Sequence, residues 1–226
     1  FLFLVGIGQL TLTILWWSFT LAGVHPAGSV IGNVPVVLMH APLLLYIALP
    51  PMFFGFLLTV FPRWMGYPDM MPGAYVPTGG GYAIAALMSW DGLLTGHGAL
   101  LAYAFFAALL ASLWGITMLL RVAMRERRDS KGPTWHAWSI LAAFGSALSG
   151  QIVLLCFLYS LDPACLMFAN RIGLNLFLMP VFLTVTHRML PFFAANAVRG
   201  YRLWRPFWLL GCIWAGVVSL SLGELM

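Results

Sequence analysis

Seven ionisable side chains lie within or at the ends of long apolar stretches of this chain. They are His40, Asp91, His97, His136, Arg171, His187 and Glu224. Burying such groups in hydrocarbon costs several kcal/mol, so membrane proteins keep them for a purpose. Neutral imidazoles ligate metal ions and haem iron, and a nearby cation pairs with haem propionates. The set therefore points to bound haem or metal, or to polar contacts between helices.

The composition predicts the elements that must position these side chains. Hydrophobic residues make up 62% of the 226 residues and charged residues 8%, whereas a soluble domain has about 25% charged residues. Such an apolar chain cannot cover itself with polar surface. We therefore expect an all-α polytopic transmembrane helix bundle in a lipid bilayer, with residues 1–226 forming one domain.

Seven stretches have, or approach, the length of about 20 apolar residues that a transmembrane helix needs. They are Phe1–Ala22, Val36–Phe61, Gly81–Leu94, Ala99–Leu120, Trp135–Ser160, Ala164–His187 and Pro206–Leu225. The third stretch is short, and the run Gly79–Gly81 predicts a loop hinge before it. Pro42 and the pair Pro50–Pro51 predict two kinks or breaks in the second stretch. Because the chain starts without Met and stops inside an apolar run, we expect it to be part of a longer protein.

The positive charges predict how these helices are oriented. The stretch 121–131 reads RVAMRERRDSK and is cytoplasmic by the positive-inside rule. Alternation then places the connections 62–80 and 188–205 on the same side, with a cytoplasmic N-terminus. Ten of the eleven Lys and Arg residues lie on that side. The net charge of +5 is thus juxtamembrane, where it meets lipid headgroups, and does not indicate nucleic acid.

This topology sorts the ionisable side chains by depth. An outer set near the non-cytoplasmic face consists of His40, Asp91, His97, Arg171 and Glu224. His136 and His187 lie together at the inner face. Because His40 and His187 are about 20–25 Å apart by helix rise, they are not expected to bind one iron.

A haem site at the outer face is one interpretation. Two histidines on neighbouring helices are the simplest axial ligation of a b-type haem in a helix bundle. His40 and His97 would ligate the iron, and Arg171 would pair with a propionate.

Copper is a second metal suggested by the residue types. Soft thioethers and imidazoles suit Cu(I), and Met39 adjoins His40 while Met189 follows His187 by two residues. Met52 is a further thioether in the second stretch. Methionine is also ordinary packing in membrane helices, so the pattern leaves both roles open.

The same residues have plainer explanations. A histidine at the membrane edge often forms interfacial hydrogen bonds, and His136, flanked by Trp135 and Trp138, fits the aromatic belt. Arg171 and Asp91 would form a structural salt bridge between two helices.

Two longer motifs resemble those of a known family. The first is HAP at 40–42, followed after an apolar interval by GFLLTVFPRWMG at 55–66, and the second is HRMLPFF at 187–193. Both are similar to motifs of the NnrS family of haem- and copper-containing membrane proteins, and they stand in the same order. The resemblance covers the whole chain and about the N-terminal half of a typical member.

The resemblance implies a polytopic bundle that holds haem b, with copper as a further metal, in the bacterial inner (cytoplasmic) membrane. It also implies a link to nitric oxide or nitrosative stress. We expect no classical enzyme activity. It matches His40 to the first histidine of the family motif His-Ala-His-Glu-Met, and His187 and Arg188 to the second motif. Pro42 and Leu43 stand where the family has a second histidine and a glutamate.

The candidate ligands are therefore, in order, His40, His187 and His97. The residues assigned structural or polar roles are Asp91, His136, Arg188 and Glu224. The two departures from the motif favour an alternative function, a metal-free structural subunit packed against other subunits of a larger membrane redox or photosynthetic complex. A transporter half, with a path lined by Asn170, Arg171 and Asn175, is a third alternative.

Overall fold

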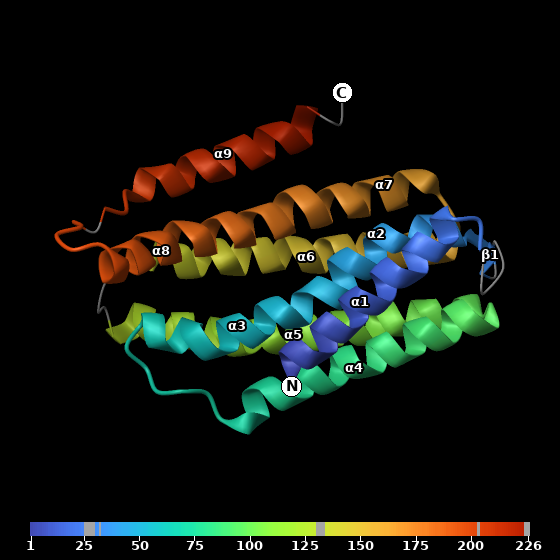
Figure 1. Ribbon diagram of the computed structural model, residues 1–226, viewed down its shortest axis with the longest axis horizontal. Coiled ribbons are helices and arrows are strands. Elements are labelled where there is room, and N and C mark those ends of the chain that lie inside the picture. Colours follow the sequence, from blue (N-terminus) through green and yellow to red (C-terminus); the bar gives the residue numbers. More distant parts are fainter. Residues whose placement is uncertain (25–29, 32, 130–133, 203, 224–226) are drawn as a thin grey trace.

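The computed structural model describes residues 1–24, 30–31, 33–129, 134–202 and 204–223, and nearly all of them are helical (Figure 1). Helices dominate because hydrocarbon contains no water to hydrogen-bond backbone N–H and C=O groups. Each segment must therefore form these backbone hydrogen bonds within itself. The only described strands, β1 (Val30–Ile31) and β2 (Val34–Pro35), form a short antiparallel pair after the first helix.

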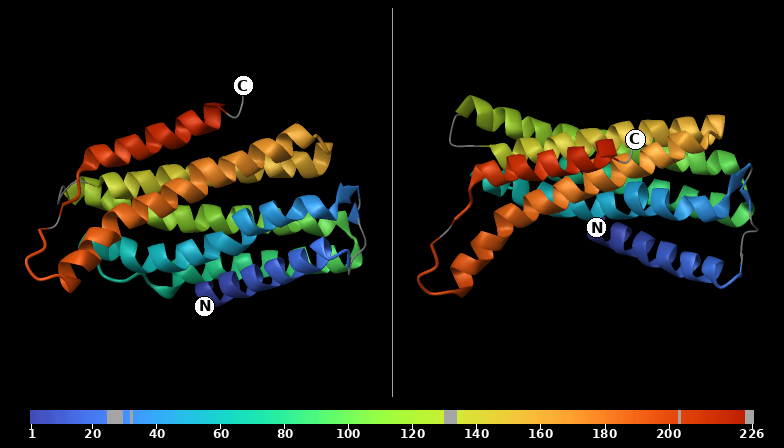
Figure 2. Two further views of the ribbon diagram at one scale, coloured as in Figure 1. Left: turned by 45° about the horizontal axis from the view of Figure 1, so that its top comes forward. Right: turned by 90° about the horizontal axis from the view of Figure 1, so that it is seen from above.

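The helices form seven consecutive segments. Their bounds are α1 (Leu2–Leu21); α2 (His40–Leu43) and α3 (Leu49–Trp64); α4 (Pro72–Thr95); α5 (Gly98–Asp129); α6 (Trp135–Ser160); α7 (Pro163–Arg171) and α8 (Met179–Ala197); and α9 (Phe207–Gly223). Successive segments run in opposite directions along the bundle (Figures 1 and 2). The prediction of an all-α polytopic bundle is confirmed.

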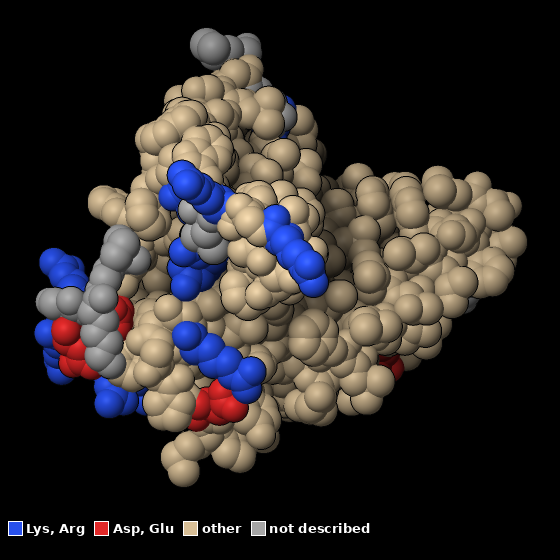
Figure 3. All heavy atoms as spheres, turned by 60° about the vertical axis from the view of Figure 1, so that its left-hand side comes forward, with Lys and Arg blue, Asp and Glu red and all other residues tan. Residues whose placement is uncertain are grey.

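Most basic side chains gather at one end of the bundle, which we call the basic end. It comprises residues 65–71, the last turn of α5, the start of α6 and the described residues of 198–206. Figure 3 looks onto this end and shows Arg side chains over it. The opposite end holds residues 22–24, the β1–β2 pair and the turns at 96–97 and 161–162. Glu224 lies outside the described residues.

Among the described residues, five segments are long and apolar enough to cross a membrane: Leu2–Leu21, Val36–Trp64, Gly98–Asp129, Trp135–Ser160 and Pro163–Ala197. α9 is shorter, with 17 residues. α4 has 24 residues and rises about 36 Å, which is long enough to span, although it is not one of these five segments.

The expected hinge at Gly79–Gly81 is wrong, because these glycines lie inside α4. A Cβ on Gly79 would stand 2.5 Å from the Phe1 ring, and one on Gly81 would stand 2.8 Å from the Ala111 side chain. The glycines therefore let α4 approach α1 and α5 closely, which is how small residues serve membrane helices.

The second and sixth segments are continuous but irregular, so the prolines that were expected to kink or break the second segment do not end it. A π-helical stretch, Leu44–Ala48, precedes Pro50 and Pro51, and another, Ile172–Leu178, precedes Pro180. The wider turns absorb the missing proline donors without ending the helix.

The two π-helical stretches pack against each other in the core. Tyr46 is fully buried and donates a 2.5 Å hydrogen bond from its hydroxyl to the Ala169 carbonyl. Gly150 and Gly173 lie so close to the Tyr46 hydroxyl that any side chain there would collide with it. This contact joins the two segments that carry the family-like motifs.

Candidate functional site

At the opposite end, His40 is held in one orientation. Its ring stacks on Trp17 of α1, with centroids 3.9 Å apart and planes 16° apart. Its Nδ1 lies 2.8 Å from the Val37 carbonyl oxygen, which can only accept, so Nδ1 carries the proton. Nε2 therefore holds a lone pair, and it has no hydrogen-bond partner among the described residues. This is the arrangement that metal-bound histidines use, with the second nitrogen donating to a backbone carbonyl.

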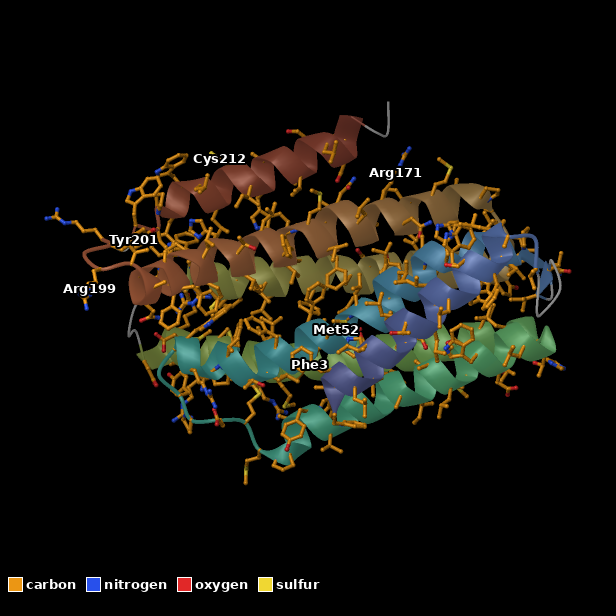
Figure 4. The ribbon with its side chains drawn as sticks, viewed as in Figure 1. Phe3, Met52, Arg171, Arg199, Tyr201 and Cys212 are labelled. Carbon is orange, nitrogen blue, oxygen red and sulfur yellow. The ribbon has the colours of Figure 1, made fainter. Side chains whose placement is uncertain are left out.

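The structure does not gather the rest of the outer set around His40. His97 is exposed in the turn between α4 and α5, and Asp91 is exposed on α4. No described hydrogen bond or ring contact joins His97 to His40. Arg171, at the end of α7, points towards α9 and away from α2 (Figure 4), and it lines a cavity with Val218 of that helix.

At the basic end, the predicted inner pair is in direct contact. His136 Nε2 lies 2.8 Å from His187 Nδ1, and His187 Nε2 lies 3.2 Å from the Pro206 carbonyl oxygen. His136 is only 2% exposed, so it is a buried residue and not the lipid-facing belt residue that its tryptophan neighbours suggested. The pair joins α6, α8 and the start of α9.

The bonding pattern fixes the protons of this pair. The Pro206 carbonyl only accepts, so Nε2 of His187 donates to it. A neutral His187 then accepts at Nδ1 from the Nε2–H group of His136. A neutral His136 is left with a bare Nδ1, and this buried atom has no hydrogen-bond partner.

His136 lines a cavity of about 430 Å³, which we call the inner cavity. Its walls come from the end of α3, the end of α5, the start of α6, α8 and the approach to α9. The lining residues are Trp64, Met65, Gly66, Glu126, Thr134, His136, Ala137, Arg188, Arg205 and Phe207. The volume is typical of a small-ligand site.

Two polar residues of this cavity were missed by the sequence reasoning, Glu126 and Arg205. Glu126 is 3% exposed, and its Oε2 and the Nε of Arg205 are buried without hydrogen-bond partners among the described residues. Both sit in strongly basic segments, where they read as ordinary juxtamembrane charges. The sequence signal was an acid set between arginines in RVAMRERRDSK, which alone does not reveal burial.

Glu126 is held beside a tyrosine that donates to a second carboxylate. The hydroxyl of Tyr67 donates a 2.5 Å hydrogen bond to Asp129 Oδ2. Burial, this hydrogen bond and the charges of Asp129 and Glu126 raise the pKa of Tyr67 to about 12, so it stays a donor at neutral pH. Arg125 lies 4.6 Å from the centre of the Tyr67 ring.

Comparison with known proteins gives one result for the whole chain. A family model described as NnrS protein matches residues 1–226. The chain belongs to the NnrS family. No curated protein and no solved structure matches it.

The motifs that resemble NnrS meet at the inner cavity. Trp64, Met65 and Gly66 end the first motif and line the cavity, and Arg188 belongs to the second. Arg188 Nη2 donates to the Trp64 carbonyl oxygen at 3.2 Å, and its guanidinium carbon lies 4.7 Å from the Trp64 ring centre. The start of the first motif, His40–Pro42, lies at the other end of the bundle.

The NnrS resemblance implies a bound haem, and one of the candidate histidines has a ring nitrogen suited to ligate its iron. His40 offers Nε2, whereas both ring nitrogens of His187 are hydrogen-bonded. His136 offers only Nδ1, the ring nitrogen nearest the main chain, where a porphyrin would collide with the histidine's own backbone. His97 makes no contact that would orient it.

The described residues fit copper less well. Among them, no group of three or more His, Cys, Asp or Glu side chains lies close enough to share a metal ion. Met52 fills the space over Gly6 of α1, where a Cβ would stand 2.3 Å from its Cγ, and Figure 4 shows it beside Phe3 at the α1–α3 contact. Its thioether therefore serves packing.

Proposed function

We propose that this NnrS-family membrane protein binds haem b through His40 and takes part in handling nitric oxide or nitrosative stress at the bacterial inner membrane. A haem iron held by one histidine supplies an open coordination position at which a gas such as nitric oxide binds. The observation that carries the proposal is the state of the His40 ring, with Nδ1–H donated to Val37 and the Nε2 lone pair available.

The surroundings of His40 support its role as a ligand. Stacking on Trp17 and the bond to Val37 hold the imidazole in one tautomer and one orientation before any cofactor arrives. His40 is also the residue that matches the first histidine of the family motif. Copper binding is a second proposal that rests on the family resemblance alone. The haem proposal does not depend on it.

The test is a reduced-minus-oxidised absorption spectrum of the full-length protein purified in detergent, with metal analysis of the same sample. We expect haem α and Soret bands, and a shift of the Soret band when nitric oxide is added to the reduced protein. His40→Ala should abolish the bands, because no other described histidine offers an oriented Nε2. His97→Ala is the matched control, since it removes an exposed imidazole from the same end.

Four outcomes would contradict the proposal. A colourless preparation that copurifies with a large redox or photosynthetic complex would favour the metal-free structural subunit. Bands that survive His40→Ala but disappear in His136→Ala would move the haem to the inner cavity. If the Soret band does not shift when nitric oxide is added, the haem site would stand but its role in binding the gas would be contradicted. Copper found without haem would replace the cofactor.

A further inference from the structure

The inner cavity holds polar atoms that the haem proposal does not use. His136 and Glu126 are 2% and 3% exposed, each has a buried polar atom without a hydrogen-bond partner among the described residues, and both line a cavity that Arg188 and Arg205 also line. Buried polar atoms are almost always hydrogen-bonded, so such a cluster indicates a missing ligand. We propose that the inner cavity binds the headgroup of an anionic phospholipid whose headgroup carries hydroxyl groups, of the phosphatidylglycerol type.

The charge of the cavity favours a monoanion. Arg188 and Arg205 contribute two positive charges and Glu126 one negative charge, while His136 is neutral in the deduced tautomer. The net charge is thus +1, and a buried charge requires compensation. One phosphodiester supplies one negative charge. A zwitterionic lipid would leave the cavity positive.

The donors and acceptors of the cavity match this headgroup. Arg205 Nε is an unpartnered donor, and phosphodiester oxygens only accept. His136 Nδ1 and Glu126 Oε2 are unpartnered acceptors, which need hydroxyl donors beyond the phosphate. The phosphodiester provides acceptor oxygens for the arginine, and the glycerol headgroup provides two hydroxyl donors for the two acceptors.

An apolar groove adjoins the inner cavity at Phe207. A hollow of about 530 Å³ lies between α6 and α9, and Phe207 lines both it and the inner cavity. Its other walls are mostly tryptophans and aliphatic side chains: Trp135, Trp138, Ser139, Ala142, Trp208, Leu210, Gly211 and Trp214. Tryptophan-rich walls are typical of headgroup depth, so an acyl chain leaving the cavity would enter this groove. Basic pockets between helices on the cytoplasmic side are known lipid-headgroup sites.

The test uses tryptophan fluorescence, because the groove is lined by tryptophans. The full-length protein in detergent is titrated with brominated phosphatidylglycerol, and separately with brominated phosphatidylethanolamine and phosphatidylcholine, which quench nearby tryptophans. We expect saturable quenching by phosphatidylglycerol with a half-saturation at least about tenfold lower than for either zwitterionic lipid, as a hydrogen-bonded charge pair supplies.

Arg205→Gln should raise the half-saturation for phosphatidylglycerol by about tenfold or more, because it removes the unpartnered donor and one charge. Arg199→Gln is the matched control, since Arg199 is exposed in the same segment and extends away from the bundle (Figure 4). It should leave the titration unchanged. If Arg205→Gln does not fold, the comparison of the three lipids on the unmodified protein still tests the proposal.

Equal quenching by the three lipids, or an equal loss in Arg199→Gln, would overturn the site. Displacement of bound phosphatidylglycerol by inorganic phosphate would assign the cavity to a free anion and overturn the lipid assignment. The proposal does not rest on haem at His40, since a colourless protein that selects phosphatidylglycerol leaves it standing.

Discussion

The two ends of the bundle use the same residue types in different ways. At the opposite end, no described hydrogen bond or ring contact joins His97 to His40, and Arg171 lines a cavity with Val218 of α9. His40 is ordered by Trp17 and a backbone carbonyl. At the basic end, His136 and His187 lie on facing helices and form a direct hydrogen bond. Depth in the membrane therefore decides which side chains can meet, and the helix face decides which of them do.

Removing His187 should have the largest effect on stability. His187→Ala breaks the bonds to His136 and Pro206 and leaves a buried imidazole N–H unpartnered, which costs about 1–3 kcal/mol. Unfolding of the purified protein in detergent measures this loss. If His187→Ala unfolds like the unmodified protein, the histidine bridge is not formed and the contrast between the two ends fails.

Ser139 tests how α9 is attached beside the inner pair. Its hydroxyl bonds to Thr184 at 2.7 Å and accepts from Trp214 Nε1 of α9 at 2.7 Å. Ser139→Ala should destabilise the protein by about 1 kcal/mol and increase proteolysis before α9. Ser146→Ala is the control, because the Ser146 hydroxyl bonds only within its own helix. A similar loss in both variants would contradict this attachment.

Trp17 tests the ordering of His40. Trp17→Leu removes the stacked ring and should cost about 0.5–1 kcal/mol, while the Val37 bond remains. The haem bands should broaden or weaken without disappearing. Unchanged bands would show that stacking does not orient the ligand.

His97 should give the smallest effect. Because its side chain is exposed and makes no described contact, His97→Ala should change the unfolding free energy by less than about 0.5 kcal/mol. The absorption spectrum should also stay the same. Loss of the haem bands in His97→Ala would show that His97 is an axial ligand. Histidines would then act together at both ends of the bundle.

The sequence predicted the architecture well, because long apolar runs and the charge asymmetry report directly on lipid. It also predicted that His136 and His187 meet, since both fall at the same depth on neighbouring segments. It missed the helical role of Gly79–Gly81, because glycine runs indicate hinges in water but close packing between membrane helices. The long helix α5 likewise continues through the charged stretch to Asp129, where periodicity no longer marks it.

The sequence could not predict which buried polar atoms lack a hydrogen-bond partner. The unpartnered Glu126 and Arg205 atoms depend on the convergence of α5, α8 and the approach to α9, which are far apart along the chain. The availability of Nε2 in His40 and its absence in His187 depend on the carbonyls of Val37 and Pro206. Such tautomers follow from tertiary contacts and not from residue spacing.

The most direct test of the account is a side-by-side measurement of haem content in the full-length protein carrying His40→Ala or His136→Ala. We predict that His40→Ala loses the haem while His136→Ala retains it and is only less stable. Haem kept by His40→Ala and lost by His136→Ala would contradict the account, because it would place the cofactor in the inner cavity.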